Sequence, residues 1–166
     1  ISEKRPWYGP DFRPKSTVEY KNFDVDIFDI LIETPDGQRV NHLLMNEEYV
    51  YSYKVRFNTE GKNVFFGMMI KNDKGLNITG ANAPSPQSKG IPHIKKGEVY
   101  YVKWFFKCTL LPGIYYTNAG VSGKVNGETC FLNRIVDAQV FKVHKNTDAK
   151  YDGLVHLSQY AEIRLL

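Results

Sequence analysis

Apolar and polar residues alternate with a period of two along much of this chain, and no stretch sustains the 3.6-residue spacing of a helix. The clearest case is residues 49–57. One side of this segment carries only large apolar or aromatic residues, namely Tyr49, Tyr51, Tyr53, Val55 and Phe57, and the other side carries Ser52, Lys54 and Arg56. A strand with one buried and one exposed face has this pattern, so the chain is predicted to be all-β.

Turn signals divide the pattern into further strands. A nearly continuous apolar run ends at the turn formed by residues 72–75, and Leu111-Pro112-Gly113 begins a new strand. Asn126-Gly127 predicts a tight hairpin. The predicted strands are residues 17–33, 38–45, 49–57, 62–72, 98–111, 114–123 and 129–144. Seven to nine strands separated by turns every 8–14 residues are typical of an immunoglobulin-like antiparallel β-sandwich.

The remaining segments lack this alternation. Residues 1–16, with three prolines, are predicted to form an extended N-terminal arm, and residues 17–166 a single sandwich domain that ends in a strand or short helix over 151–166. Pro84, Pro86, Gly90, Pro92 and Gly97 predict an irregular loop over residues 81–97. A connection of this length is usually either functional or disordered. It would either wall a site or contact a partner.

Composition fits one soluble domain with an excess of aromatic residues. The chain has 166 residues, of which 14% are aromatic and 11 are tyrosines, and its net charge is +4. The 22 basic residues form no clustered stripe, which argues against nucleic acid as a partner. No apolar run is long enough to span a membrane and no signal peptide is visible. Because the chain begins at Ile1 without an initiator Met, we expect it to be a fragment of a longer polypeptide.

Two cysteines are too few for a disulfide-stabilised secreted scaffold, which favours the cytosol. Cys108 shares a strand face with Trp104 and Phe106, so a buried reduced thiol is predicted. A bridge between Cys108 and Cys130 remains an alternative in a sandwich.

Catalytic and cofactor signatures are scarce. Residues 120–124 superficially match a phosphate loop, but Asn118 and Val125 occupy positions that require Gly and Ser/Thr. The four histidines are widely spaced, and no serine lies in a nucleophile elbow. Paired carboxylates cannot be recognised from sequence, yet the acidic residues here fall mostly in turns and at strand ends. We therefore predict a binding or assembly domain with no enzymatic activity, no cofactor and no metal.

The side chains predicted to point outward suit a carbohydrate. Aromatic faces stack on the apolar patches of sugar rings, while amide and cationic groups bind hydroxyl and acidic groups. Tyr101, Phe105 and Tyr116 are the stacking candidates, and Asn118 is a candidate for hydroxyl groups. The alternative for the aromatic residues is packing against another copy of the chain.

The order of these segments resembles the C-terminal domain of Wzt, the nucleotide-binding subunit of ABC transporters that export bacterial O-antigen polysaccharides. The resemblance covers residues 17–145. It rests on residues 26–37 (DIFDILIETPDG), the strand of residues 49–57, residues 64–82 (VFFGMMIKNDKGLNITGAN) and residues 110–116 (LLPGIYY).

The resemblance implies a non-catalytic carbohydrate-binding module that recognises the modified non-reducing end of a finished O-antigen polysaccharide. It implies a homodimer formed by exchange of a terminal strand, with the ATPase domain upstream of Ile1 and a membrane subunit as further partners. The location would be cytoplasmic, at the inner face of the bacterial inner membrane, without direct insertion. The alternative is a structural β-sandwich that dimerises or docks onto the ATPase domain.

If the terminal modification is acidic, a cation should dominate its recognition. Arg134 is the first candidate and Lys103 the second, followed by Arg56 and Lys54. The alternative for each is a solvated charge on a strand.

Overall fold

The computed structural model describes residues 4–85, 87–148 and 150–165, so Pro86 and the ends of the predicted arm and final segment (1–3 and 166) lie outside the described residues. Ten strands occur within these ranges. They are β1 (Val18–Lys21), β2 (Val25–Glu33), β3 (His42–Leu44), β4 (Glu48–Phe57), β5 (Gly61–Asn72), β6 (Asn77–Ala83), β7 (Ile91–Ile94), β8 (Val99–Lys107), β9 (Gly113–Val125) and β10 (Glu128–His144).

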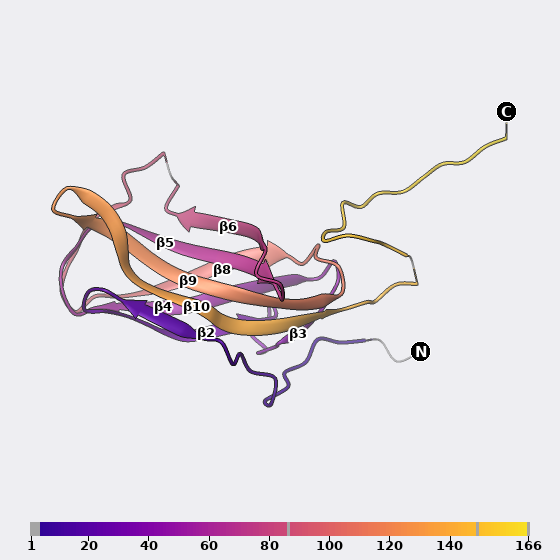
Figure 1. Ribbon diagram of the computed structural model, residues 1–166, viewed down its shortest axis with the longest axis horizontal. Coiled ribbons are helices and arrows are strands. Elements are labelled where there is room, and N and C mark those ends of the chain that lie inside the picture. The colour runs from indigo at the N-terminus through magenta and orange to yellow at the C-terminus, as the bar shows by residue number, and fades with distance from the viewer. Residues whose placement is uncertain (1–3, 86, 149, 166) are drawn as a thin grey trace.

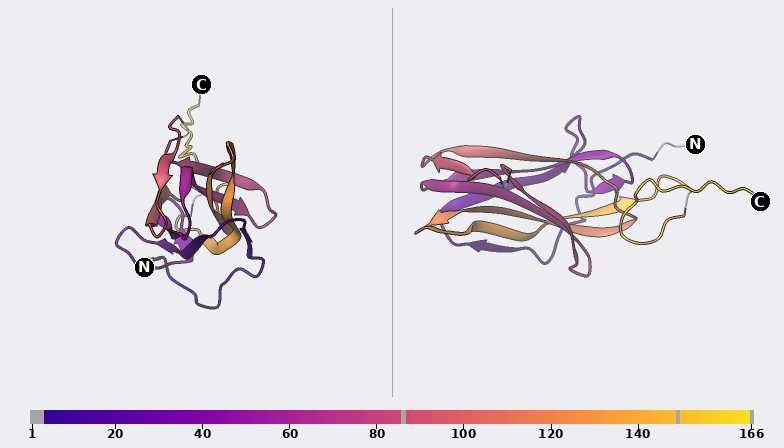
Figure 2. Two further views of the ribbon diagram at one scale, coloured as in Figure 1. Left: turned by 90° about the vertical axis from the view of Figure 1, so that its left-hand side faces the viewer. Right: turned by 90° about the horizontal axis from the view of Figure 1, so that it is seen from above.

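The strands form two layers (Figures 1 and 2). The large sheet has the order β1-β10-β9-β5-β6, with β3 paired to β10 and β7 paired to β5, and the small sheet has the order β2-β4-β8. All pairs are antiparallel except β3 with β10. The predicted immunoglobulin-like β-sandwich is confirmed.

The core lies between the two sheets and is rich in tyrosine. Tyr49, Tyr51 and Tyr53 on β4 are buried, as predicted from the alternation, and so is Tyr115 on β9. Trp104 and Phe106, also predicted to be core residues, are half-buried and pack against the edge of this core. Burial of large apolar surfaces of this kind is the main stabilising term in folding.

The predicted hairpin at Asn126-Gly127 and the predicted turn over residues 72–75 are both present. The turn between β9 and β10 places Asn126 and Gly127 at φ values of 53° and 81°, a left-handed conformation that these two residue types tolerate. Gly75 takes a φ of 81° in the turn that joins β5 to β6. The hairpin turns therefore fix the registers of the large sheet.

The prediction of one continuous strand over 17–33 is wrong, because this segment crosses from one sheet to the other. β1 pairs with β10 in the large sheet and β2 pairs with β4 in the small sheet. The amides of Asn22 and Phe23, between these strands, both donate to the carbonyl of Leu132. The predicted strand over 38–45 is reduced to β3, which covers only residues 42–44.

The prediction of an irregular loop over 81–97 is also wrong in part. β6 pairs with residues 66–71 of β5, and β7 pairs with residues 61–64 of the same strand. The length of β5 therefore accommodates two short edge strands one after the other. Edge strands tolerate proline, since one side of the strand needs no hydrogen-bond donor.

The two ends of the chain behave differently. The described part of the N-terminal arm (residues 4–15) has a turn at residues 10 and 11, and Trp7 forms an isolated β-bridge with His42. The final strand or helix predicted over 151–166 is wrong for the described residues, which contain only a bridge between Val155 and Leu110. Beyond this bridge the chain runs away from the sandwich (Figure 1).

Candidate functional site

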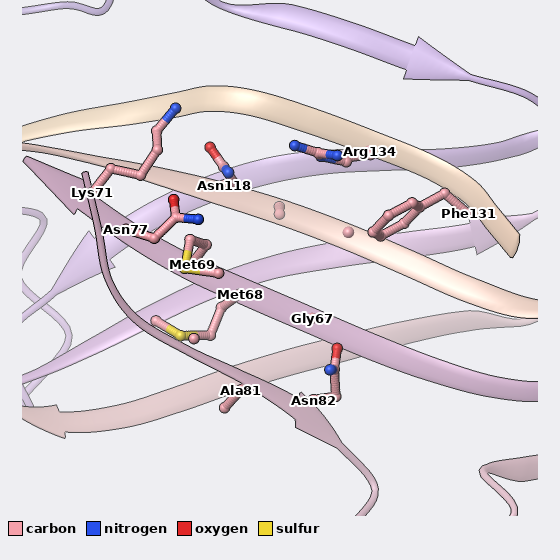
Figure 3. A pocket seen from close by; sticks show the side chains of 13 residues that line it. Gly67, Met68, Met69, Lys71, Asn77, Ala81, Asn82, Asn118, Phe131 and Arg134 are labelled. Carbon is pink, nitrogen blue, oxygen red and sulfur yellow. The ribbon is translucent and has the colours of Figure 1, made fainter. Parts of the chain in front are cut away.

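A hollow lies on the outer face of the large sheet, and its shape follows from two glycines in the middle of adjacent strands. Gly67 on β5 is the direct cross-strand partner of Gly120 on β9. Asn82 on β6 flanks Gly67, and Arg134 on β10 flanks Gly120. Because neither glycine carries a side chain, the amide of Asn82 can lie close over Gly67 and the ring of Phe131 close over Gly120. The hollow lies among these side chains and Arg134 (Figure 3).

The pocket has a volume of about 490 Å³. Its walls carry amides, a cation and apolar groups, from Met69, Lys71, Asn77, Asn82, Asn118, Phe131 and Arg134. A second hollow of about 370 Å³ adjoins the first, since Asn82 and Phe131 line both. The two hollows together extend across β6, β5, β9 and β10. Figure 3 shows the side chains that line the first of them.

Two tyrosines of the small sheet form hydrogen bonds with the backbone of the strands that make the floor of the pocket. The hydroxyl of Tyr53 donates to the carbonyls of Gly67 at 2.7 Å and Gly120 at 3.3 Å. The hydroxyl of Tyr51 donates to the carbonyl of Asn118 at 3.2 Å. These bonds cross the interior of the sandwich and link the core directly to the backbone of the pocket.

Two cations reach the pocket, and their surroundings differ. Lys71 pairs with Asp137, with Nζ and Oδ1 separated by 2.5 Å. The guanidinium of Arg134 lies 5.3 Å from the ring centre of Phe131, and within the described parts of the chain it forms no ion pair. Arg134 therefore keeps its charge available to a ligand.

The structure places the eight candidate residues of the sequence analysis on two opposite faces. Arg134, Asn118 and Tyr116 lie on the outer face of the large sheet, and the first two line the pocket. Asn118 is buried rather than exposed. Lys54 and Arg56 on β4 and Tyr101, Lys103 and Phe105 on β8 lie on the outer face of the small sheet.

On the small sheet the candidates contact one another or neighbouring residues of the same face. Lys54 pairs with Asp29 at 3.1 Å, and Lys103 lies 4.8 Å from the ring centre of Tyr101. Arg56 lies 4.7 Å from the ring centre of Phe28. Phe105 is 76% exposed. These five residues line neither of the two hollows on the large sheet nor a third hollow of about 290 Å³ beside Phe23 and Lys124.

Several pocket residues were missed by sequence reasoning, namely Met69, Lys71, Asn77, Asn82 and Phe131. The available signal was the pair of glycines inside strands, at Gly67 in an apolar run and at Gly120, because glycine in a strand interior often marks the close approach of a ligand. Asn82 and Ala81 belong to the long segment of residues 81–97, whereas His93 lies outside the pocket lining.

Other kinds of site receive no support from the described residues. They contain no group of three or more potential metal-binding side chains and no helix that could span a membrane. Both cysteines are free, and burial raises the pKa of Cys108 to about 12, although the hydrogen bond with Leu110 opposes this rise. The predicted buried thiol at Cys108 is confirmed.

The fold and the pocket define a two-sheet antiparallel β-sandwich domain with an open polar hollow on its larger sheet. The family model of the Wzt C-terminal domain matches residues 16–157. The chain belongs to the Wzt C-terminal domain family, which confirms the resemblance noted in the sequence.

One solved structure supports the same fold. A structure described as the crystal structure of the C-terminal domain of Wzt is similar with a TM-score of 0.77 and 21% sequence identity, covering 96% of this chain and 93% of that one. The soluble domain of PmoD from Methylocystis sp. ATCC 49242 (Rockwell) matches with a TM-score of 0.35 and 12% identity over 75% of this chain and 94% of that one. The comparison with curated proteins finds no match.

Proposed function

We propose that this domain binds carbohydrate without catalysing a reaction, and that it recognises the modified non-reducing end of an O-antigen polysaccharide for export by an ABC transporter. The observation that carries the proposal is the glycine-floored pocket between Asn82 and Arg134. The domain would act at the cytoplasmic face of the inner membrane, together with the ATPase domain and the membrane subunit of the transporter. Family membership supports this assignment.

The chemistry of the pocket suits a sugar. The side-chain amides of Asn77, Asn82 and Asn118 offer both donors and acceptors for hydroxyl groups. The exposed ring of Phe131 offers an apolar face to the C–H groups of a sugar ring. The open shape would allow the end of a long chain to enter while the remainder stays in solvent.

Arg134 gives the pocket a preference for an acidic terminal group. A guanidinium can form two parallel hydrogen bonds with a carboxylate or a phosphate, and these charge-assisted bonds are stronger than neutral ones. Because no carboxylate of the described chain pairs with Arg134, a ligand would not have to displace a competing acid.

Calorimetric titration with polysaccharide prepared with and without its terminal modification tests the function. We expect binding of the modified chain only. Equal affinity for both forms would contradict recognition of the end, and hydrolysis of either form would indicate an enzyme instead.

A matched pair of arginine variants locates the site. Arg134→Ala should weaken binding by roughly 10- to 100-fold, since a hydrogen bond to a charged group contributes about 1.5–3 kcal/mol. Arg56→Ala removes an arginine that also lies over a phenylalanine, but on the small sheet. We expect Arg56→Ala to leave affinity unchanged and both variants to keep the melting temperature. The reverse order of effects would move the site to the small sheet.

A strand-exchanged homodimer is the second part of the proposal, and the C-terminal tail (residues 157–165) supports it. Val155 pairs antiparallel with Leu110, which follows β8 in the chain, and β8 is an edge strand of the small sheet. The tail could therefore form an additional strand along the free edge of β8. In the single chain its apolar side chains Leu157, Ile163 and Leu165 are exposed. The β8 of a second copy would offer them a partner. The same arrangement would serve the alternative role of a purely structural dimerisation domain.

A further inference from the structure

Asp137 does not line the pocket but contacts two residues that do, Lys71 and Asn118, and it lies at a bulge in β10. The register between β9 and β10 shifts between Ile135 and Gln139, and Asp137 takes a φ of 52° within this irregularity. Aspartate is one of the few residues other than glycine that adopt this conformation readily. Asp137 has four polar atoms, two in the backbone and two in the carboxylate, and each of them contacts a different side chain.

Two of these contacts reach the wall of the pocket. The carboxylate oxygen Oδ1 lies 2.5 Å from Nζ of Lys71 on β5. The amide of Asp137 donates to Oδ1 of Asn118 on β9 at 3.0 Å. Only 14% of the Lys71 side chain and 16% of the Asp137 side chain are exposed, so solvent screens this pair weakly.

The other two contacts reach the segment that precedes β1. The hydroxyl of Ser16 donates to Oδ2 of Asp137 at 2.6 Å. The hydroxyl of Thr17 donates to the carbonyl of Asp137, also at 2.6 Å. One residue therefore bonds both to the wall of the pocket and to the chain segment that joins the N-terminal arm to the sandwich.

We propose that Asp137 is a positioning residue that couples the segment of residues 16–17 to the pocket. It holds Lys71 and Asn118 in place and neutralises Lys71, which leaves Arg134 as the cation available to a ligand. An anion that draws Lys71 away from Asp137 would loosen the hold on Ser16, and release of residues 16–17 would in turn free Lys71, because coupling between two sites is reciprocal.

The protonation of Asp137 agrees with this role. Burial alone would raise the pKa of the Asp137 carboxyl, but the hydrogen bonds from Lys71 and Ser16 outweigh it, and the pKa lies below its ordinary value. The carboxylate is therefore charged at neutral pH and able to hold both partners.

Hydrogen exchange tests the coupling without any ligand. Lys71→Met keeps most of the apolar stem but removes the ammonium, and we expect the amides of residues 16–21 to exchange roughly threefold faster or more. Asn77→Ala, on the same wall of the pocket, serves as the control because Asn77 makes no contact with Asp137 in the described structure. The control should leave exchange in this segment unchanged.

A double-mutant cycle tests the coupling between Ser16 and Lys71 through the equilibrium of unfolding. The effects of Ser16→Ala and Lys71→Met on the unfolding constant should be non-additive by a factor of about 2 to 10, as found for residues that share one network. A control cycle combines Lys15→Ala with Lys71→Met, and the effects of these two variants on the unfolding constant should be additive. Additive effects of Ser16→Ala and Lys71→Met would overturn the proposal whatever the exchange data show.

The link between residues 16–17 and the pocket does not depend on the proposed function. Only its effect on glycan binding rests on that function. If the domain binds no glycan but the cycle is non-additive, Asp137 still links the segment to the pocket and the ligand assignment is wrong. If glycan binding is confirmed and the cycle is additive, the site stands and the coupling is wrong.

Discussion

Single tyrosine hydroxyls connect the core of this domain to its candidate site. Tyr53 is fully buried, yet its hydroxyl has partners in the carbonyls of Gly67 and Gly120. A buried polar group without such partners would destabilise the fold. The position of Tyr53 therefore serves both the packing of the sandwich and the shape of the pocket floor.

Tyr53→Phe should lower the free energy of unfolding by about 1–2 kcal/mol, because the hydroxyl and its two buried acceptors lose their hydrogen bonds. Denaturant unfolding measures this change. Tyr100→Phe is the control, since the hydroxyl of Tyr100 bonds to Glu98 at a half-buried position. A loss at Tyr53 no larger than that at Tyr100 would show that the bonds to the pocket floor contribute no stability.

At the residue scale, the sequence predicts burial better than it predicts partners. Alternation identified Tyr51 and Tyr53 as core residues, because the period of a strand fixes which side chains share a face. It could not show that their hydroxyls reach β5 and β9, since that depends on how the two sheets stack. For the same reason the sequence could not show that Asn118, although it lies on the outer face of the large sheet, is buried beside Asp137.

Among the elements, the N-terminal arm is attached through an aromatic and histidine cluster. The Trp7 ring stacks on His42 with ring centres 4.2 Å apart, and Nδ1 of His42 lies 2.8 Å from Nε2 of His144. Asn41 adds side-chain hydrogen bonds to Gly9 and Phe12. The arm is thus fixed at the point where β3 meets β10.

The histidine contact should make stability fall as the solution becomes acidic. Burial lowers the pKa of His42, with Lys142 as a further cause, and burial followed by His42, Lys142 and Lys4 lowers the pKa of His144. The unfolded chain, with histidine pKa values near 6.5, therefore binds more protons than the folded protein. The stability contributed by the neutral pair is complete above about pH 6.5 and is lost as the pH falls below it.

Chemical unfolding at pH 7.5 and 5.5 measures this effect. His144→Gln should reduce the difference in unfolding free energy between the two pH values, because it removes one of the two groups that gain protons on unfolding. His93→Gln, at an exposed position on β7, should leave the difference as it is in the unmodified protein. An equal effect of both variants would exclude the histidine pair as the origin of the pH dependence.

Long strands joined by tight turns were predicted well from the sequence, and short edge strands were not. The hairpin of β9 and β10 follows from Asn126-Gly127, whose conformation is locally determined. β6 and β7 have little alternation and contain or adjoin prolines, so only the free edge of β5 makes them strands. Tertiary pairing of this kind has no local signal in the sequence.

For the whole molecule, the sequence showed which residues point outward but not from which sheet. Arg134 and Lys103 were the first and second candidates for binding an acidic group, yet they lie on the outer faces of opposite sheets. The pairing of strands decides this, and alternation within each strand carries no information about it. Only the pocket on one face, which is lined by four strands of the large sheet, separates the two groups.

Deletion of residues 157–166 tests the proposed strand-exchanged dimer and should yield a monomer in sedimentation analysis. Each large aliphatic side chain that the tail buries against a partner would stabilise the dimer by about 1.5–3 kcal/mol. If the tail continues the antiparallel pairing of Val155, Leu157, Ile163 and Leu165 share one face and Glu162 lies on the other. Ile163→Asp should then dissociate the dimer, whereas Glu162→Gln should not. A dimer that survives both the deletion and Ile163→Asp would show that the copies associate through another surface, and a monomeric full-length chain would show that the tail serves a different partner.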